Sequence, residues 1–364
     1  VYPEFKKLFF ENISPDQENI EELVTFYSGV VDHLEHYVFL KFNRDEGNNY
    51  SSVADKAFRL NFLKIETPFP FLMRVLDIYK KGKISEKDLS QIFGTIENYL
   101  ARRIICNMTT TGLNKFFSTL HKEIENYLSK YAGESYSSIF NYILSNRSGD
   151  LRIPKDTEIE SAVQNNPFYT QRNIYINFIL SSIDDQSKES KLLHQMANGD
   201  IQLTIEHIMP QTLSRSWKES LGGNYEEIHM NYLHTLPNLT LTAYNSKYSN
   251  NDFNAKKTIE NGFNDSPLII NQYIKKIDKW DETAFKKREK WWLFQINKIW
   301  PLAQSSFVPE SSEAEIIFAD DADLKGLRIK GINLFGETID CDSWITAFAI
   351  ILKKFFEMDA NLYD

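Results

Sequence analysis

The fold is decided by the stretch Ile201-Gln202-Leu203-Thr204-Ile205-Glu206-His207-Ile208, whose first residues alternate between apolar and polar as a β-strand does. A turn signal, Asn198-Gly199-Asp200, comes directly before it. A second strand pattern follows about 30 residues later, Leu236-Pro237-Asn238-Leu239-Thr240-Leu241-Thr242, and we expect a helix over residues 243–260. The order of strand, insertion, strand and helix predicts a small ββα unit in the middle of the chain.

The residues before the first strand predict helices almost throughout. Apolar side chains recur at helical spacing over residues 18–41, 58–81, 85–108 and 114–131, and again over residues 171–184. Gly82 separates the second pattern from the third, as a residue that ends a helix does. Alternating strand patterns are nearly absent from this region. We therefore predict a helical domain over residues 1–155 that serves as a scaffold.

The residues after the ββα unit predict a linker and a small closing element. Ser, Pro and acidic residues dominate residues 304–324, which indicates an acidic linker. Residues 327–339 alternate, with Gly331 and Gly336 at turns, and predict a hairpin that packs on a helix over residues 343–358. The predicted fold is mainly α (α+β). Its parts are the helical domain 1–155, a domain with the ββα core over 156–303, the linker 304–324 and a small α+β element over 325–364.

Composition narrows the class of protein. The chain has 364 residues, of which 42% are hydrophobic and 25% charged, as in soluble globular proteins of two or three domains. No apolar run approaches the roughly 18 residues of a membrane span. Two distant cysteines, Cys106 and Cys341, exclude a disulfide framework and suit a reducing cytoplasm. The net charge of −9 excludes a strongly basic coat for nucleic acid, although not a local basic face.

The residues of the ββα unit meet the needs of phosphodiester hydrolysis, which are a base for water, a hard cation and oxygen ligands for that cation. His207 at the end of a strand can be the base, because the ordinary pKa of histidine, about 6.5, lies near working pH. Glu206 points to the opposite face of the strand unless the backbone bends, and Pro210 suggests such a bend. The second strand and its helix can bring an amide oxygen to the other side of the metal.

Two longer runs carry a family resemblance. They are Thr-Ile-Glu-His-Ile-Met-Pro-Gln-Thr-Leu at residues 204–213 and His-Thr-Leu-Pro-Asn-Leu-Thr-Leu-Thr-Ala-Tyr-Asn-Ser-Lys-Tyr-Ser-Asn-Asn-Asp-Phe-Asn-Ala-Lys-Lys at residues 234–257. The layout resembles the His-Me finger, or HNH, nucleases. More closely, the runs resemble the nuclease domain of the GmrSD family, type IV restriction endonucleases that act on modified DNA. The resemblance covers about residues 155–302, including Ser266, Asn271, Trp280, Arg288 and Trp300-Pro301.

The resemblance implies a role for each residue of the site. His207 matches the general base of the family, and Asn238 matches the structural Asn that ties the loop near the base. Glu206 matches the acidic residue that helps to hold the metal, and Asn245 matches the metal ligand on the helix. Asn250 is the competing choice for that ligand, because HNH enzymes in general place it further along the chain than Asn245.

The expected cofactor is a hard divalent cation, Mg²⁺ or Mn²⁺. Glu206 and Asn245 supply only oxygen ligands, and such ligands suit hard ions. One departure from the family is Pro237, which stands where many relatives carry Gly and puts the entry into the second strand in doubt. His229 and His234 lie in the insertion before the second strand, where they either line the site or are structural.

The segment after the second strand is locally basic and predicts contacts with DNA. Residues 245–300 hold eleven Lys or Arg against seven Asp or Glu. We expect Lys256, Lys257 and Arg288 to meet DNA phosphates. The alternative interpretation of such clusters is a solvated helix face with the neighbouring tryptophans in the core.

The predicted function is divalent-metal-dependent DNA hydrolysis, and the family implies a role in type IV restriction or anti-phage defence in the bacterial cytoplasm. No membrane contact is expected. Members of the family usually carry an amino-terminal nucleotide-hydrolysing domain with a Gly-Gln-Gln-Arg type motif. This chain has neither that motif nor a P-loop, so we expect such a domain to lie before Val1 or on a partner.

Two other functions remain open at this point. The chain could be a DNA-binding or protein-docking module whose nuclease site is inactive or is completed only on assembly. The intact set of Glu206, His207, Asn238 and Asn245 argues against that alternative, because a degenerate module is expected to have lost at least one of them. The third function is RNA cleavage, which the residues alone do not distinguish from DNA cleavage.

Overall fold

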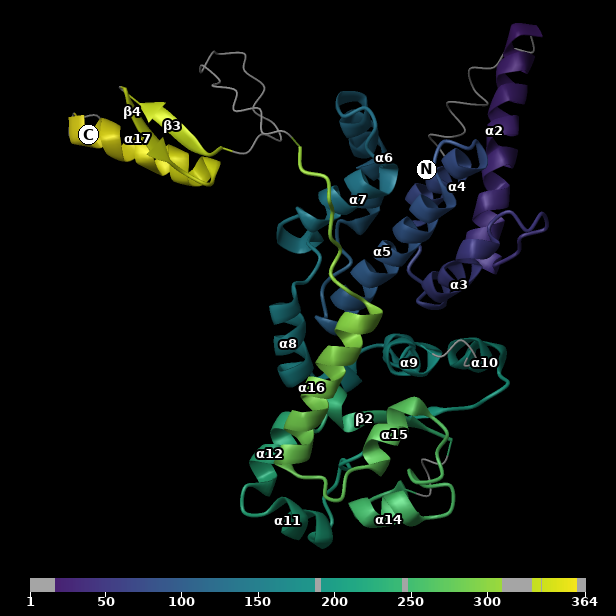
Figure 1. Cartoon of the computed structure of the whole chain (residues 1–364), viewed down its shortest axis with the longest axis vertical. Helices are drawn as coiled ribbons and strands as arrows, with labels where there is room; N and C mark the ends of the chain where they lie inside the picture. Colours follow the sequence, from purple (N-terminus) through teal and green to yellow (C-terminus); the bar gives the residue numbers. More distant parts are fainter. Residues whose placement is uncertain (1–16, 187–190, 244–247, 310–328, 335, 359–364) are drawn as a thin grey trace. The chain divides into compact units, whose positions relative to one another are not determined.

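The structure is a computed structural model, and it describes residues 17–186, 191–243, 248–309, 329–334 and 336–358 (Figure 1). The chain divides into two compact units, Val1–Pro309 and Glu310–Asp364. Helices predominate, and two small antiparallel sheets complete the described parts. The predicted mainly α (α+β) fold class is confirmed.

The front of the first unit is helical, as predicted. Its elements are α2 (Gln17–Phe42), η1 (Ser51–Val53), α3 (Ala54–Phe62), α4 (Phe69–Lys80), α5 (Glu86–Ile105), α6 (Leu113–Lys130), α7 (Tyr136–Ser145) and η2 (Gly149–Leu151). The single helix predicted over residues 58–81 is wrong, because the chain breaks between α3 and α4. Pro68 and Pro70 explain the break, since proline lacks the amide hydrogen that a helix interior needs. Gly82, with a φ of 68°, follows α4 as predicted.

The second half of the unit surrounds one short hairpin with helices (Figure 1). Its elements are α8 (Asp156–Asn165), η3 (Phe168–Thr170), α9 (Asn173–Ser181), η4 (Asp184–Gln186), α10 (Leu192–Asn198), β1 (Thr204–His207), α11 (Arg215–Leu221), α12 (Tyr225–Tyr232), η5 (Leu236–Asn238), β2 (Leu239–Thr242), α14 (Phe253–Thr258), α15 (Ile269–Lys275) and α16 (Glu282–Ile299). The order of strand, insertion, strand and helix is that predicted from the sequence.

The two strands pair antiparallel over their full length. Ile205 lies opposite Leu241, and His207 lies opposite Leu239. The pairing continues one step further, because the amide of Ile208 donates to the carbonyl of Asn238 at 2.9 Å. Of the helix expected over residues 243–260, residues 244–247 lie outside the described residues, Tyr248 is helical, and a separate helix, α14, begins at Phe253. Asp252 caps it by accepting from the amide of Ala255 at 2.8 Å, which fixes that start.

Helix α15 contacts β2 through hydrogen bonds from the side chain of Asn271. The amide group of Asn271 donates to the carbonyl of Leu241 at 2.9 Å, and its oxygen accepts from the hydroxyl of Thr240. The first turn of α15 is capped by Asp184, whose carboxylate accepts from the amide of Ile269 at 2.7 Å. Burial nevertheless raises the pKa of Asp184 to about 6. The hairpin is therefore fixed by side-chain contacts from distant segments.

The helical front and the hairpin region share one core. A single hydrophobic cluster runs from Phe39 to Phe307 and includes Leu239 and Leu241 of β2. Inside it, Arg59 binds Glu97 at 2.8 Å, and the indole of Trp300 donates to the same carboxylate at 3.0 Å. A second cluster, with Met209, Trp217, Trp280 and Phe285 among its members, supports the chain beyond β1.

The second unit is a small α+β element, as predicted. Strands β3 (Gly331–Leu334) and β4 (Glu337–Asp340) form an antiparallel hairpin, and α17 (Trp344–Met358) follows. Gly336 lies in the turn with a φ of 84°, whereas Gly331 belongs to a strand. Most of the predicted acidic linker, residues 310–328, lies outside the described residues. Across the helices that the structure describes, none is long and apolar enough to cross a membrane.

Candidate active site

Asn238 anchors the site from the last position of η5, directly before β2. It is fully buried, and its side-chain oxygen accepts from the amide of Met209 at 2.8 Å. Its side-chain nitrogen donates to the carbonyls of Met209 and Leu233, both at 2.9 Å. Three hydrogen bonds thus tie the chain beyond β1 to the insertion between the strands. The family resemblance implies such a loop-tying role for Asn238.

His207 ends β1 in a nearly closed environment, with 5% of its surface exposed. Its Nε2 lies 3.3 Å from Nδ1 of His234, and the ring of Tyr169 packs edge-on at 4.3 Å between centroids. Burial, followed by the nearby His234, Lys256 and His229, lowers the pKa of His207 to about 4. The imidazole is therefore neutral near pH 7, as a base must be before it takes a proton.

Tyr169 and His234 hold one another beside His207. The amide of Tyr169 donates to the carbonyl of His234 at 3.0 Å, and the two rings stack at 5.6 Å with an interplanar angle of 11°. Burial, followed by the nearby His229, lowers the pKa of His234. His229 itself faces away, with Nε2 3.1 Å from the carbonyl oxygen of Pro210.

Tyr169 was not predicted from the sequence. It lies on the short helix η3, and no motif marks it. His234 was one of two histidines for which the sequence left lining the site and a structural role open. The structure brings His234 against His207, whereas His229 bonds to the backbone of Pro210.

Glu206 and Lys256 form a buried ion pair that joins β1 to α14. Nζ of Lys256 lies 2.6 Å from Oε1 of Glu206 and 2.8 Å from the backbone oxygen of His207. Glu206 is 5% exposed and Lys256 is fully buried. Burial raises the pKa of Glu206 and lowers the pKa of Lys256, because removing each charge from water costs more than their attraction returns.

The described residues do not fit a metal ion at Glu206. The carboxylate predicted as a ligand already holds an ammonium group, which would repel a dication at the same place. Asn245 lies outside the described residues, and Asn250 is exposed beyond β2. Within the described ranges, no three His, Cys, Asp or Glu side chains gather as a metal site requires.

Two of the three predicted DNA contacts are corrected by burial. Lys256 and Arg288 have no exposed surface, so neither can reach a phosphate in this structure. Lys257 is half-buried, and its Nζ donates to the carbonyl of Ile277 at 2.6 Å. Lys287 and Lys290, from the same run as Arg288, are exposed on α16.

Arg288 instead supports β2 from within the core. Its guanidinium donates to the carbonyl of Leu239 at 3.3 Å and lies over the rings of Tyr273, Trp280 and Trp291 at 5.2 to 5.7 Å. Burial lowers the pKa of Arg288 to about 9. The interpretation that the tryptophans beside this basic run, Trp291 and Trp292, belong to the core holds for Trp292, which is fully buried, whereas Trp291 is half-buried.

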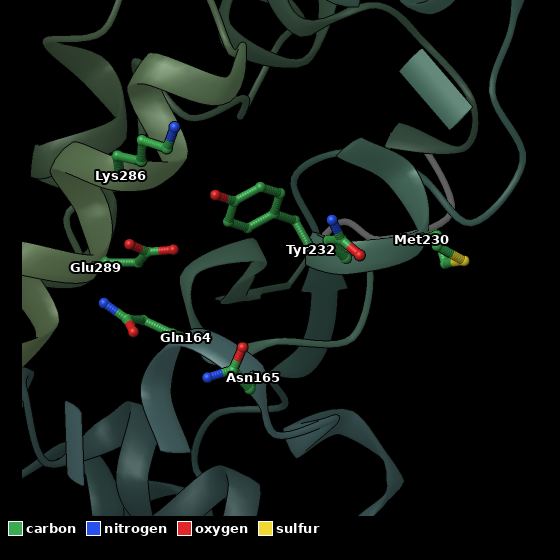
Figure 2. A pocket seen from close by; sticks show the side chains of 7 residues that line it. Gln164, Asn165, Met230, Tyr232, Lys286 and Glu289 are labelled. Carbon is green, nitrogen blue, oxygen red and sulfur yellow. The ribbon is translucent and has the colours of Figure 1, made fainter. Parts of the chain in front are cut away.

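A polar pocket of about 490 Å³ opens where α8, α12 and α16 meet (Figure 2). Its polar lining residues are Gln164, Asn165, Asn231, Tyr232, Lys286 and Glu289. Asn165 precedes Tyr169 by four residues, and Tyr232 precedes His234 by two, so the pocket borders the segments that carry the ring cluster. Burial raises the pKa of Glu289, whose carboxylate points toward the Tyr232 side of the pocket in Figure 2.

The fold and site thus describe a ββα hairpin with a neutral histidine at its strand end, set among helices. Residues 153–293 match the family described as GmrSD restriction endonucleases, C-terminal domain. The match covers β1, β2, α14 and the first two thirds of α16, and it confirms the predicted resemblance. This segment is therefore similar to the C-terminal domain of the GmrSD restriction endonucleases. A search of curated proteins finds no match to the chain.

Proposed function

We propose that this chain is an endonuclease that hydrolyses phosphodiester bonds in DNA, with His207 as the general base. One observation carries the proposal, namely a neutral, buried imidazole at the end of β1, in the segment that matches a restriction endonuclease family. A base must be unprotonated and firmly placed before substrate arrives. Asn238 supplies the placement by fixing the backbone that follows His207.

The proposed step is the attack of water on phosphorus. His207 takes one proton from the water as the new oxygen–phosphorus bond forms, and the bond from phosphorus to the leaving sugar oxygen breaks. The leaving oxygen carries the electron pair of that bond and requires a cation or a proton. The expected contribution of the base is about 10² to 10⁴ in rate.

We further propose Mg²⁺ or Mn²⁺ as the cation, as the sequence predicts. Glu206 is occupied by Lys256 in this structure, so the remaining predicted ligands are Asn245, Asn250 and the phosphate oxygens of DNA. A site built from so few protein ligands is expected to bind metal weakly until DNA is present. Metal titration with cleavage as the readout, against excess EDTA, tests this requirement.

The family description also supports a biological role, which we propose for this chain. Restriction endonucleases cut foreign DNA, so we infer a defence function against phage, with modified DNA as the substrate. A nucleotide-hydrolysing domain, on the same protein or on a partner, would supply control of cleavage. The exposed Lys287 and Lys290 replace Lys256 and Arg288 as the expected phosphate contacts.

Plasmid cleavage tests the proposal directly. The wild-type protein is incubated with supercoiled plasmid and Mg²⁺ or Mn²⁺, beside His207→Ala and a control, His33→Ala, that removes a histidine on α2. We expect nicked or linear DNA from the wild type and the control, and none from His207→Ala. DNA binding without cleavage by any of the three would favour the docking-module alternative. Cleavage of RNA but not DNA would favour the ribonuclease alternative.

A further inference from the structure

His207 contacts the second histidine through one ring nitrogen only. Its Nε2 lies 3.3 Å from Nδ1 of His234. No hydrogen bond to Nδ1 of His207 forms within the part of the chain that the structure describes. The two nitrogens of this imidazole are therefore in different positions, since one is held by a neighbour and the other is left for another partner.

The contact restricts where the protons lie. A neutral imidazole carries one N–H, so a single hydrogen bridges the two rings. If His234 were the donor, His207 would carry its own proton on Nδ1 and would have no nitrogen left to accept one from water. If His207 is the donor through Nε2, its Nδ1 is bare and can act as a base. The second arrangement places the proton of His234 on Nε2, on a ring that is only half-buried.

We propose that His234 is the positioning residue of this site, whose Nδ1 accepts a hydrogen bond from Nε2 of His207 and so makes Nδ1 of His207 the atom that takes the proton. This inference rests on the proposed function of His207 as a base. It assigns His234 the role that a carboxylate has beside the histidine of a catalytic triad. When His207 becomes positively charged, the same hydrogen bond is strengthened by the charge.

Tyr169 explains why His234 is a suitable partner. A hydrogen bond to the backbone of His234 at 3.0 Å and the nearly parallel rings fix the position and the plane of the second imidazole. The edge of the same tyrosine packs on His207 at 4.3 Å between centroids. Both imidazoles thus pack against one aromatic ring. This packing restricts their rotamers to those in which Nε2 of His207 lies near Nδ1 of His234.

Two substitutions separate the hydrogen bond from the packing. His234→Phe keeps a flat ring against Tyr169 but has no acceptor, whereas His234→Asn loses the ring and keeps an amide oxygen near the place of Nδ1. We expect kcat for plasmid cleavage to fall about tenfold to hundredfold in His234→Phe, the usual loss when a partner that orients a functional histidine is removed. KM should change little, and His234→Asn should recover most of kcat.

His33→Phe is the matched control, because it makes the same chemical change on α2 and should leave kcat unaltered. Melting temperatures of all variants show whether each one is folded. The inference is overturned if folded His234→Phe cleaves at the wild-type rate. It is equally overturned if His234→Asn loses as much activity as His234→Phe, since that result would assign the effect to the ring.

A measurement without cleavage separates this inference from the proposed function. Nitrogen-15 NMR of histidine-labelled protein reports which ring nitrogen of His207 carries the proton, with His207→Gln to assign the signal. We expect Nε2–H and a bare Nδ1 in the wild type, and a mixture of the two forms in His234→Phe. A wild type with Nδ1–H would overturn the positioning role. A wild type with Nε2–H that cuts no DNA would instead refute the nuclease proposal and leave the hydrogen bond intact.

Discussion

Replacing Lys256 with methionine should destabilise the fold strongly, although it exchanges a charged side chain for an apolar one of similar length. Lys256 is fully buried and donates to Glu206 at 2.6 Å and to the carbonyl of His207 at 2.8 Å. Lys256→Met leaves the Glu206 carboxylate in a site that is 5% exposed, with no cation beside it. Breaking a buried ion pair from one side costs about 3 to 5 kcal/mol, because the remaining charge is neither hydrated nor paired.

The assay is urea unfolding of four proteins, namely the wild type, Lys256→Met, Glu206→Gln and the double variant. Because the double variant leaves no charge in the site, it should be less destabilised than the sum of the single variants. We expect an interaction energy of about 1 to 3 kcal/mol. Lys257→Met is the matched control, since its half-buried ammonium makes one bond, to the carbonyl of Ile277, and should cost only about 1 kcal/mol.

The same variants test what Glu206 does for the metal. If Lys256 occupies the carboxylate as the structure shows, Glu206→Gln should not change the Mg²⁺ concentration that half-maximal cleavage requires. A large rise in that concentration would mean that Glu206 holds the ion and that the pair opens when DNA binds. A Lys256→Met variant as stable as Lys257→Met, or a strictly additive cycle, would refute the buried pair itself.

Three further predictions concern the base, the DNA surface and pH. His207→Ala should lower the cleavage rate by about 10² to 10⁴ with DNA affinity unchanged in a gel-shift assay. Lys287→Ala and Lys290→Ala should each weaken DNA binding and reduce its salt slope by about 1, and unchanged slopes would place the DNA elsewhere. The pKa of Asp184 is raised to about 6 from an ordinary 3.8. The free energy of unfolding that the protonated carboxyl of Asp184 contributes is therefore fully present below about pH 4 and is lost as pH rises through 6. Asp184→Asn should therefore be stabilised relative to the wild type by about 2 to 3 kcal/mol at pH 7, but not at pH 4, in urea unfolding.

Local pattern was sufficient for the hairpin, and the family resemblance pointed to the asparagine that ties the loop. Alternation marked both strands, and Asn238 lies where the family resemblance places a residue that ties the loop. The single helix predicted after β2 is interrupted, because Asp252 caps the start of a separate helix, α14. The break between α3 and α4 was missed, although Pro68 and Pro70 were visible in the sequence.

Contacts between residues that are distant in sequence produced no such pattern in the sequence. His207 meets a histidine 27 positions later and a tyrosine from another helix, and neither spacing corresponds to a helix or strand period. The charge count of residues 245–300 likewise contained no information about burial, since it treated Lys256 and Arg288 as surface cations. Both proved to be fully buried, where a positive charge supports the backbone of a strand instead of a phosphate.

For Glu206, the alternation of side chains along a strand opposes the metal-ligand role that the family resemblance implies. Successive side chains of a strand point to opposite faces, so Glu206 and His207 can share one metal site only if the backbone bends between them. The bend suggested by Pro210 does not occur within β1, whose pairing with β2 is regular through His207. The carboxylate is then left on a buried face, where it requires a cation, and Lys256 of α14 is that cation. The ion pair consequently fixes α14 to the strand that carries His207, and its ammonium also binds the backbone oxygen of His207. Glu206 therefore contributes to this region by holding β1 and α14 together.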